Sequence, residues 1–426
     1  MTNLRIVLFI VLFLTVILSV YYFVIDDNIY YIIAQEPTLN DPNLQVETIV
    51  EGLSLPTSMA FIDNNNILIL EKEKGMVRLV SNGILQEEPV LEIDVNSRSE
   101  RGLLGIAILN KNAVFLYFTE SSIEENDQLR NRIYKYQWND EEQLLVNPTL
   151  ILDLPAIPGP NHDGGKLIIG PDNYLYAVIG DLNHMGKLQN IVNGPEPDDT
   201  GVIFRVNPKD GSPAPDNPFI NNNNELSSLN KYYAYGIRNS FGIAFDPITD
   251  ILWDTENGPN EYDEVNVVKP GFNSGWFQVM GPISKSGITE DELVNFPNSK
   301  YADPVFNWLP SLGVTDIEFL NSSKLGDKYT NNIFVGDIGV LTDGYLYYFE
   351  VNEDRTGIKF DNSSQARLTD LIADNEEEMS AIALGKAFGG ITDIETGPDG
   401  FLYILTLDIR SNGEGNIYRI TPLSWE

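Results

Sequence analysis

A strand–turn–strand pattern recurs along this chain and leaves few folds open to it. Each copy joins two apolar strands, rich in β-branched and aromatic residues, through a turn rich in Asn, Asp, Gly or Pro. No long stretch after the N-terminal segment has helical periodicity, so the pattern predicts an all-β repeat protein. Six copies are present, beginning at Thr57, Gly102, Gly164, Phe241, Thr315 and Thr392.

The spacing of the copies indicates the kind of repeat. They begin between 45 residues (Thr57 to Gly102) and 77 residues (Gly164 to Phe241) apart. This is loose for a short solenoid but fits propeller blades of four strands with inserted loops. We therefore expect a six-bladed β-propeller over residues 49–426. Loops from every blade converge at one end of a propeller's central channel, where a ligand would sit.

The N-terminal segment is apolar enough to span a bilayer. Residues 6–25 carry no charge, and about 20 such residues suffice for a transmembrane helix. Arg5 precedes the run and Asp26 follows it, so the remainder should lie outside the cytoplasmic membrane. We expect a signal anchor or transmembrane helix in residues 1–34.

A linker is expected between this anchor and the propeller, in residues 35–48, where Pro37 and Pro42 stand among polar residues. A cleaved signal peptide is the alternative to an anchor, and it would make the protein secreted. The apolar core of such a peptide is usually only about 7–15 residues and ends in small residues, which favours the anchor.

Composition excludes several function classes. The chain has 62 acidic and 27 basic side chains, a formal net charge of −35, so nucleic acid is an unfavourable partner. It has no cysteine, which excludes disulfides, a thiolate nucleophile and zinc–thiolate sites. The G-x-S-x-G, H-E-x-x-H and Walker motifs are absent, which argues against an α/β-hydrolase, a zincin or a P-loop enzyme.

Two histidines are present, and one stands in an unusual context. His162 lies in Asn161-His162-Asp163-Gly164-Gly165, directly before an apolar strand. An imidazole at the mouth of a propeller channel can take a proton from a hydroxyl near neutral pH. A solvated loop histidine is the simpler interpretation, and His184 is left with that interpretation.

Two further segments could bind a ligand. Arg238 and Asn239 precede another strand, where a guanidinium and an amide can bind a planar, oxygen-rich molecule; the alternative is an arginine that ties neighbouring blades together. The second segment is an acidic loop. Its turn carbonyls and crowded carboxylates are the oxygen ligands that calcium takes, although a solvated acidic turn would look the same. The residues of this candidate metal site are Gly258, Pro259, Glu261, Asp263 and Glu264.

Taken in order, these segments resemble the glucose/sorbosone dehydrogenase family, the soluble-type sugar dehydrogenases that use pyrroloquinoline quinone (PQQ) and are built on a six-bladed propeller. The resemblance covers nearly all of residues 48–422. It rests on the ordered set RGLLGIAI, NHDGGKLIIGPDNYLYAVIGD, YGIRNSFGIAFDP, NGPNEYDEVNVVKPGFNSGW and GPDGFLYILT.

The resemblance implies roles for the matching residues. His162 would be the general base that removes the proton of the sugar's anomeric hydroxyl while hydride passes to the quinone. Arg238 would sit over the quinone carbonyl that gains charge, and Asn239 would bind the cofactor beside it. The carbonyls of Gly258 and Pro259 would help to hold calcium. The remaining pair, Asp263 and Glu264, would support this loop or bind a further calcium.

The sequence departs from the family pattern at two cationic positions. Members that bind PQQ usually have a lysine where this chain has Ile338-Gly339, and an arginine where it has Ile391 and Thr392. PQQ is a tricarboxylate, so losing two cations should weaken its binding. Lys386 is a candidate replacement.

The leading hypothesis is therefore a membrane-anchored, extracytoplasmic quinoprotein that oxidises an aldose at its anomeric hydroxyl to the lactone. Its expected partners are a small-molecule sugar, PQQ, calcium and the membrane. The alternative is a redox-inactive propeller of the same family that binds glycan or protein. A calcium-dependent lactone hydrolase ranks third, because the acidic residues cluster in one loop instead of coming from several blades.

Overall fold

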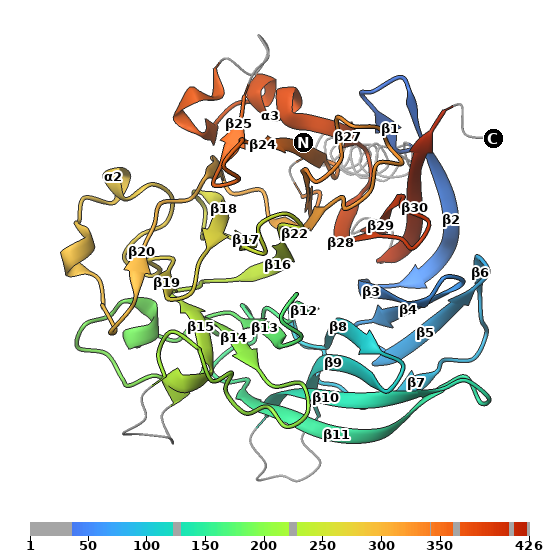
Figure 1. Cartoon of the computed structure of the whole chain (residues 1–426), viewed down its shortest axis with the longest axis horizontal. Helices are drawn as coiled ribbons and strands as arrows, with labels where there is room; N and C mark the ends of the chain where they lie inside the picture. Colours follow the sequence, from blue (N-terminus) through green and yellow to red (C-terminus); the bar gives the residue numbers. More distant parts are fainter. Residues whose placement is uncertain are drawn as a thin grey trace, which may run out of the picture. The chain divides into compact units, whose positions relative to one another are not determined.

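The described part of the chain is built almost entirely of β-strands. The computed structural model describes residues 36–121, 129–220, 228–340, 342–360, 367–408 and 413–423. Contacts divide the chain into Met1–Glu36 and Pro37–Glu426, and every described strand and helix lies in the second unit. The described strands form six sheets arranged around a central axis, which confirms the all-β propeller class (Figure 1).

The first three sheets lie in the N-terminal half of the unit. The first contains β3 (Pro56–Asp63), β4 (Asn66–Glu71), β5 (Met76–Ser81), β6 (Ile84–Leu85) and β7 (Leu91–Glu92). The second contains β8 (Leu103–Asn110), β9 (Ala113–Glu120), β10 (Arg130–Asn139) and β11 (Leu144–Pro155). The third contains β12 (Leu167–Ile169), β13 (Leu175–Ile179), β14 (Val202–Val206), β15 (Tyr232–Tyr235), β19 (Phe272–Asn273) and β20 (Lys300–Tyr301).

The other three sheets complete the set. The fourth contains β16 (Ser240–Phe245), β17 (Leu252–Glu256), β18 (Asp263–Val268), β21 (Phe306–Trp308) and β26 (Ile372–Ala373). The fifth contains β22 (Val314–Phe319), β23 (Ile333–Asp337), β24 (Leu346–Val351), β25 (Ile358–Lys359), β27 (Ala383–Lys386) and β1 (Thr38–Leu39). The sixth contains β28 (Gly390–Thr396), β29 (Leu402–Asp408), β30 (Glu414–Pro422) and β2 (Leu44–Ser54).

Short helices lie only in the connections of the described residues. Two are α-helical, α2 (Ile283–Ser286) and α3 (Glu376–Ile382). Four are 3₁₀ turns, η1 (Lys187–Gln189), η2 (Ser228–Lys231), η3 (Glu290–Glu292) and η4 (Leu368–Asp370). None of the described helices is long and apolar enough to span a bilayer. The predicted anchor, residues 1–34, lies outside the described residues.

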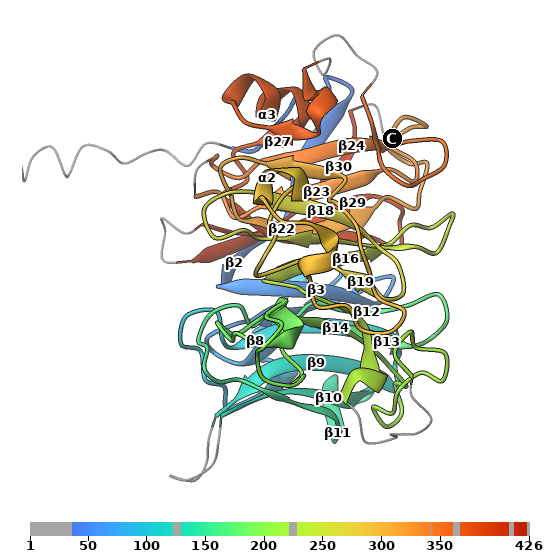
Figure 2. The same ribbon diagram turned by 90° about the vertical axis from the view of Figure 1, so that its left-hand side faces the viewer.

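Each predicted repeat copy supplies the first two strands of a different sheet. The first strands, β3, β8, β12, β16, β22 and β28, contact one another in that order, and β28 contacts β3. In each sheet the strands that pair beyond this first strand lie progressively farther from the axis, as β8 to β11 show in the side view (Figure 2). Strand ends and the loops that follow them are therefore brought together around the axis.

The two ends of the propeller unit pair with each other. Strand β2 is antiparallel to β30, with Val46 opposite Ile420, so an N-terminal strand completes the sheet of the C-terminal strands. Strand β1 pairs with β27 in the preceding sheet. The linker expected in residues 35–48 is thus wrong in part, because β1 and the start of β2 lie within it. Outer strands are half exposed, so a polar sequence is compatible with pairing there.

Apolar side chains fill the spaces between neighbouring sheets. Leu68 and Leu70 of β4 pack with Val114 and Leu116 of β9, and all four are fully buried. Equivalent clusters join the other neighbouring sheets. Because both faces of each sheet are covered, the strands read as nearly continuous apolar runs, and the polar strand ends are left to line the channel.

Candidate active site

One cavity lies where the inner strands meet. Its volume is about 630 Å³, within the usual range for small-molecule sites. Every sheet contributes a residue from its first strand or directly beside it. These residues are Thr57, Leu104, Lys166, Phe241, Thr315 and Thr392. Four of the predicted site residues line the same cavity, namely His162, Arg238, Asn239 and Gly258.

His162 is held in place by contacts at both its backbone and its ring. It is only 9% exposed and has φ 63°, a left-handed conformation that a turn next to Gly164 and Gly165 imposes. The backbone N–H donates to Glu100 Oε2 at 2.7 Å, and Nδ1 of the ring bonds Asp181 Oδ1 at 2.6 Å. This is not the solvated loop histidine of the simpler interpretation.

Asp181 fixes the tautomer of His162. A carboxylate only accepts hydrogen bonds, so Nδ1 carries the proton and Nε2 is left with a lone pair. The second carboxylate oxygen, Oδ2, accepts the indole N–H of Trp276 at 2.6 Å. The backbone N–H of Asp181 donates to Arg238 O at 2.8 Å, which ties two functional segments together. An imidazole held in this way can act as a general base.

Arg238 and Asn239 lie on the neighbouring wall. The guanidinium Nη1 of Arg238 donates to Asn257 O at 2.7 Å, and its Cζ lies 5.2 Å from the centre of the Trp276 ring. Asn239 Nδ2 donates to Glu100 Oε2 at 3.0 Å. Arg238 Nε and Asn239 Oδ1 are buried and have no partner among the described residues, so both can bind a ligand.

Glu100 is a site residue that the sequence did not reveal. One carboxylate oxygen accepts from both His162 and Asn239, so it joins two loops that are far apart in the sequence. Its neighbour Ser99 contacts Asn161, with Oγ 2.5 Å from Oδ1. These contacts depend on tertiary structure, and no local sequence pattern around Glu100 or Asp181 predicts them.

The predicted calcium loop divides into two parts. Asp263 is fully buried, and its carboxylate accepts N–H groups from Gly258, Leu312, Gly313 and Val314 at 2.7 to 3.1 Å. It therefore supports the loop, one of the two roles considered for it. Gly258 O lies 3.1 Å from Ser311 Oγ and keeps at least one lone pair for a ligand.

Glu264 points to the other face of β18 and joins a buried acidic group. It accepts N–H groups from Gly281 and from Asn266, and burial raises its pKa well above the usual value. Glu256 lies opposite it in the sheet, and burial raises the pKa of Glu256 to about 7. Within the described ranges, no three acidic or histidine side chains are grouped as metal ligands.

Cations are present in the cavity, but not at the positions the family pattern suggests. Ile338 and Thr392 line the wall at the two positions in question. Lys386 is exposed on β27 and does not line the cavity, so it is not the replacement. Instead, Lys72 and Lys166 line the cavity together with Arg238.

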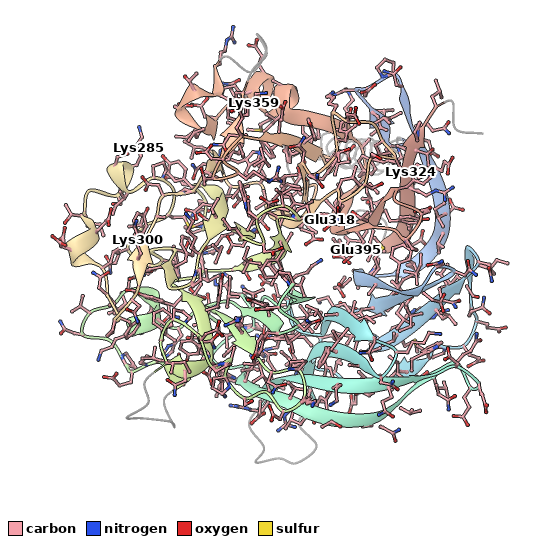
Figure 3. The ribbon with its side chains drawn as sticks, viewed as in Figure 1. Lys285, Lys300, Glu318, Lys324, Lys359 and Glu395 are labelled. Atoms are coloured by element: carbon pink, nitrogen blue, oxygen red, sulfur yellow. The ribbon has the colours of Figure 1, made fainter. Side chains whose placement is uncertain are left out.

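Lys166 belongs to a charged cluster around the axis. Its ammonium lies 2.8 Å from Asp316 Oδ2 and also pairs with Asp393. Glu318 and Glu395 extend the cluster, and Figure 3 shows both near the centre of the ring, far from the peripheral lysines. Asp393 also accepts the N–H of Met59 at 2.6 Å. These contacts link strands β3, β22 and β28 to the residue that directly precedes β12.

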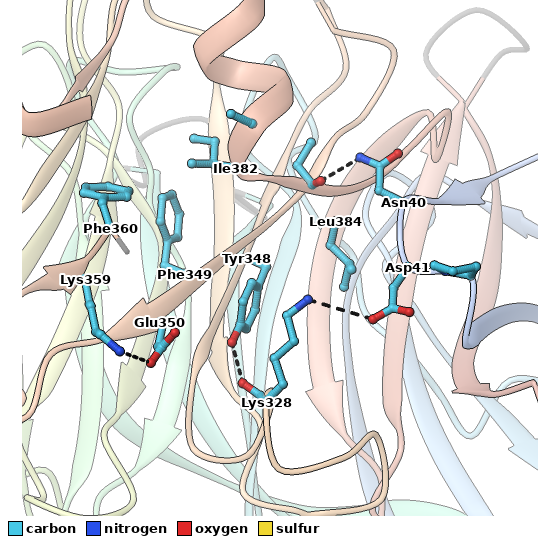
Figure 4. A pocket seen from close by; sticks show the side chains of 13 residues that line it. Asn40, Asp41, Lys328, Tyr348, Phe349, Glu350, Lys359, Phe360, Ile382 and Leu384 are labelled. Atoms are coloured by element: carbon cyan, nitrogen blue, oxygen red, sulfur yellow. Dashed lines mark hydrogen bonds and ion pairs between the residues drawn. The ribbon is translucent and has the colours of Figure 1, made fainter. Parts of the chain in front are cut away.

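A second cavity, of about 350 Å³, lies at the periphery between β24, β27 and residues 40–42 (Figure 4). Its charged groups pair with one another: Lys359 with Glu350 at 2.7 Å, and Lys328 with Asp41 at 3.9 Å. No predicted site residue lies there. His184, the other histidine, pairs with Asp198 at 2.9 Å and does not line the main cavity.

Comparison with known proteins agrees with this geometry. Residues 53–419 match the sequence model described as Glucose / Sorbosone dehydrogenase. The aldose sugar dehydrogenase of Escherichia coli is 25% identical over 383 residues, covering 89% of this chain and 93% of that protein. Quinoprotein glucose dehydrogenase B of Acinetobacter calcoaceticus is 30% identical over 270 residues, 58% of this chain and 55% of that protein.

A comparison with solved structures also finds proteins described as glucose dehydrogenases. A putative oxidoreductase (glucose dehydrogenase) of Thermus thermophilus superposes with a TM-score of 0.67 at 26% identity. The match covers 88% of this chain and 99% of that structure.

Proposed function

Because this chain belongs to the glucose / sorbosone dehydrogenase family, we propose that it oxidises an aldose sugar at the anomeric hydroxyl to the lactone, with PQQ as the hydride acceptor. One observation carries the proposal: His162, bonded to Asp181, lines the same cavity as Arg238 and Asn239. The quinoprotein named among the relatives supports the choice of cofactor.

The cavity residues fit a planar quinone. Arg238 Nε and Asn239 Oδ1 are buried and lack a partner among the described residues, so they are a donor and an acceptor that would hold the cofactor. The carbonyls of Gly258 and Pro259 would hold calcium on a loop that Asp263 supports. When bound, the quinone and its calcium supply the electron-accepting chemistry that amino acid side chains lack.

The chain's own residues would carry the proton and position the sugar. Nε2 of His162 takes the proton of the anomeric hydroxyl, so the O–H bond breaks as hydride leaves the same carbon and a C=O bond forms. Asp181 stabilises the imidazolium that results. The guanidinium of Arg238 would stabilise the negative charge that develops on the bound cofactor. The substrate would thus lose one proton to His162 and one hydride, for which the bound quinone would be the acceptor.

Three finer points belong to the same proposal. We assign one blade to each of the six sheets, which gives six blades. We place the propeller outside the cytoplasmic membrane, on the strength of the apolar run in residues 6–25 and its flanking charges. We also assign calcium as the metal, because carbonyl and carboxylate oxygens are its preferred ligands.

An activity assay on the full-length protein tests the proposal. PQQ and calcium are added, and reduction of an artificial dye is followed with a panel of aldoses. We expect dye reduction with at least one aldose, abolished in His162→Gln and retained in His184→Gln, because His184 lies outside the cavity. Failure of the wild-type protein with every aldose would reject PQQ-dependent oxidation.

A redox-inactive binding protein is the second candidate, and a specific observation favours it. Ile338 and Thr392 occupy the wall positions where cations would anchor PQQ, and Lys386 is too peripheral to replace them. This candidate predicts glycan or protein binding that needs no PQQ and persists in His162→Ala. Loss of all binding in that variant would count against it.

A further inference from the structure

Three cations line the main cavity, and they differ in what balances their charge. Lys72, Lys166 and Arg238 all reach its wall. A cation that already faces a carboxylate has little to gain from an anionic ligand, whereas a partly buried cation without one gains a charge-assisted hydrogen bond. The three can therefore be separated by their contacts.

Lys166 is already neutralised. Its ammonium pairs with both Asp316 and Asp393, and Glu395 lies 3.8 Å away. These carboxylates outweigh the effect of burial and raise the pKa of Lys166. A ligand carboxylate near Lys166 would meet negative charge as well as positive, so this lysine gives no net attraction.

Arg238 is engaged on the wall of the candidate base. Its guanidinium contacts Asn257 O and the Trp276 ring, and its backbone N–H donates to Glu256 at 2.6 Å. The proposed function already assigns this guanidinium to the cofactor, which its buried Nε would help to hold. Carboxylates thus balance the charge of Lys166, and the proposed function assigns Arg238 to the quinone, which leaves Lys72 to be considered.

The contacts of Lys72 differ from those of Lys166 and Arg238. It follows β4 directly, is partly buried, and donates only to backbone carbonyls, Ser99 O at 2.6 Å and Ser97 O at 3.5 Å. Within the described residues it makes no ion pair. An ammonium has three N–H donors, so at least one is left for a ligand. Burial lowers the pKa of Lys72 by more than the nearby charges of Glu73, Glu100 and Asp163 raise it, and an anion in the cavity would relieve that cost.

The position of Lys72 also suits a replacement anchor. Strand β3, in the same sheet, contacts β28, whose Thr392 lies on the wall that lacks a cation. Lys72, in the first sheet, is therefore available to supply the positive charge that the neighbouring sixth sheet lacks at Thr392.

We propose that Lys72 binds a carboxylate group of the ligand in this cavity. The inference rests on the proposed function and extends it to a residue that the family pattern does not assign. Two ligands could bring the carboxylate, the PQQ cofactor or an acidic sugar such as a uronic acid, and Lys72 would recognise the same chemistry in both.

Binding titrations on the full-length protein separate the possibilities. PQQ with calcium, and glucuronate and glucose without PQQ, are titrated into wild type, Lys72→Gln, Lys72→Arg and Lys386→Gln. The glutamine keeps a donor for Ser99 O but removes the charge, arginine restores the charge, and Lys386 is an exposed lysine outside the cavity. Loss of one charged hydrogen bond should weaken binding about 10- to 100-fold.

Each outcome decides a different point. If Lys72→Gln binds PQQ more weakly than wild type, while Lys72→Arg and Lys386→Gln do not, the lysine binds a cofactor carboxylate. Unchanged PQQ binding with weaker glucuronate but not glucose binding assigns it to an acidic sugar. If PQQ and glucuronate each bind Lys72→Gln as tightly as wild type, the inference is wrong, even if the protein oxidises aldoses. A wild type that binds no PQQ instead contradicts the proposed function, and the glucuronate titration then decides the inference alone.

A footprinting experiment covers the case in which Lys72→Gln does not fold. Wild-type protein is acetylated with and without PQQ or glucuronate, and modified lysines are identified by mass spectrometry. Protection of Lys72 by either carboxylate, with Lys386 unprotected, supports the inference. Equal acetylation of Lys72 with and without saturating ligand rejects it.

Discussion

Asp181 connects the candidate base to the rest of the cavity wall. It bonds His162 through one oxygen and Trp276 through the other, while its backbone N–H reaches Arg238. A histidine oriented by a buried carboxylate is poised to accept a proton, whereas a free one samples both tautomers.

The Asp181→Asn variant tests this role. An amide in place of the carboxylate can stabilise the wrong tautomer and cannot stabilise the imidazolium. We expect kcat for aldose oxidation to fall about 10²- to 10⁴-fold, with a smaller change in KM. The matched control is Asp198→Asn, because Asp198 pairs with the other histidine. Equal losses in the two variants would contradict a specific role for Asp181.

Sequence reasoning found those site residues that stand next to strand ends. His162, Arg238 and Asn239 lie in loops that the strand pattern places at the channel, and all three line the cavity. It missed Glu100 and Asp181, because their importance comes from contacts with residues 62 and 19 positions away. Short-range motifs carry no information about such pairs.

At the scale of elements, the loop after β17 depends on one carboxylate. Asp263 accepts four backbone N–H groups and the hydroxyl of Ser311, and so joins β18 to the start of β22. The loop carries Gly258, which lines the cavity.

Asp263→Asn should therefore destabilise the protein. The new amide nitrogen cannot accept hydrogen bonds, so buried N–H groups lose their partner, at a cost of about 3 kcal/mol in the free energy of unfolding. Urea unfolding measures this change. Glu261→Gln is the control, since Glu261 is exposed in the same loop and should change stability by less than about 0.5 kcal/mol.

The pH dependence of stability is set partly by strand β17. Burial raises the pKa of Glu256 from 4.5 to about 7, against the opposing effect of its bond from Ser274. Between these values the folded state keeps a proton that the unfolded state has lost. The free energy of unfolding should therefore fall as pH rises from about 4.5 to about 7, by on the order of 3 kcal/mol.

Thermal unfolding across this pH range checks the prediction. Glu256→Gln has no proton to release, so its stability should fall less with pH than that of the wild type. Asp254 and Glu264, whose pKa values burial also raises, remain in both proteins. The charge of Glu256 contributes to both of those raised pKa values, so the difference between the two curves reports Glu256 together with its effect on these neighbours. Parallel curves would contradict its raised pKa.

Turn chemistry explains how far the elements themselves could be predicted. The GPDN and GPDG turns separate β12 from β13 and β28 from β29, as expected, because Gly, Asp and Asn tolerate tight turns. Two-residue strands such as β19, β20 and β26 were not predicted. They pair in parallel with distant strands, and such short segments have no periodicity of their own.

At the scale of the whole molecule, the ring is closed by β2 and β30. Leu53 of β2 is 1% exposed and packs in the cluster that spans the first, fifth and sixth sheets. Leu53→Ala should lower the free energy of unfolding by about 2–5 kcal/mol. Ile84→Ala, at an exposed position on β6, is the control and should cost little. Comparable urea midpoints for the two variants would show that closure contributes little to stability.

The same closure has a consequence for how the chain reaches its native state. Glu47 and Thr421 lie 374 positions apart in the sequence, yet their side chains are in hydrogen-bond contact. During synthesis, β2 emerges long before β30, the strand it pairs with, so its edge stays unpaired until nearly the entire propeller has been made. Such distant pairing is slow, because the entropy of joining the ends is lost before the contacts form. Until that last step, an unpaired strand edge would be open to wrong partners, so the final blade is where misfolding or chaperone action should concentrate.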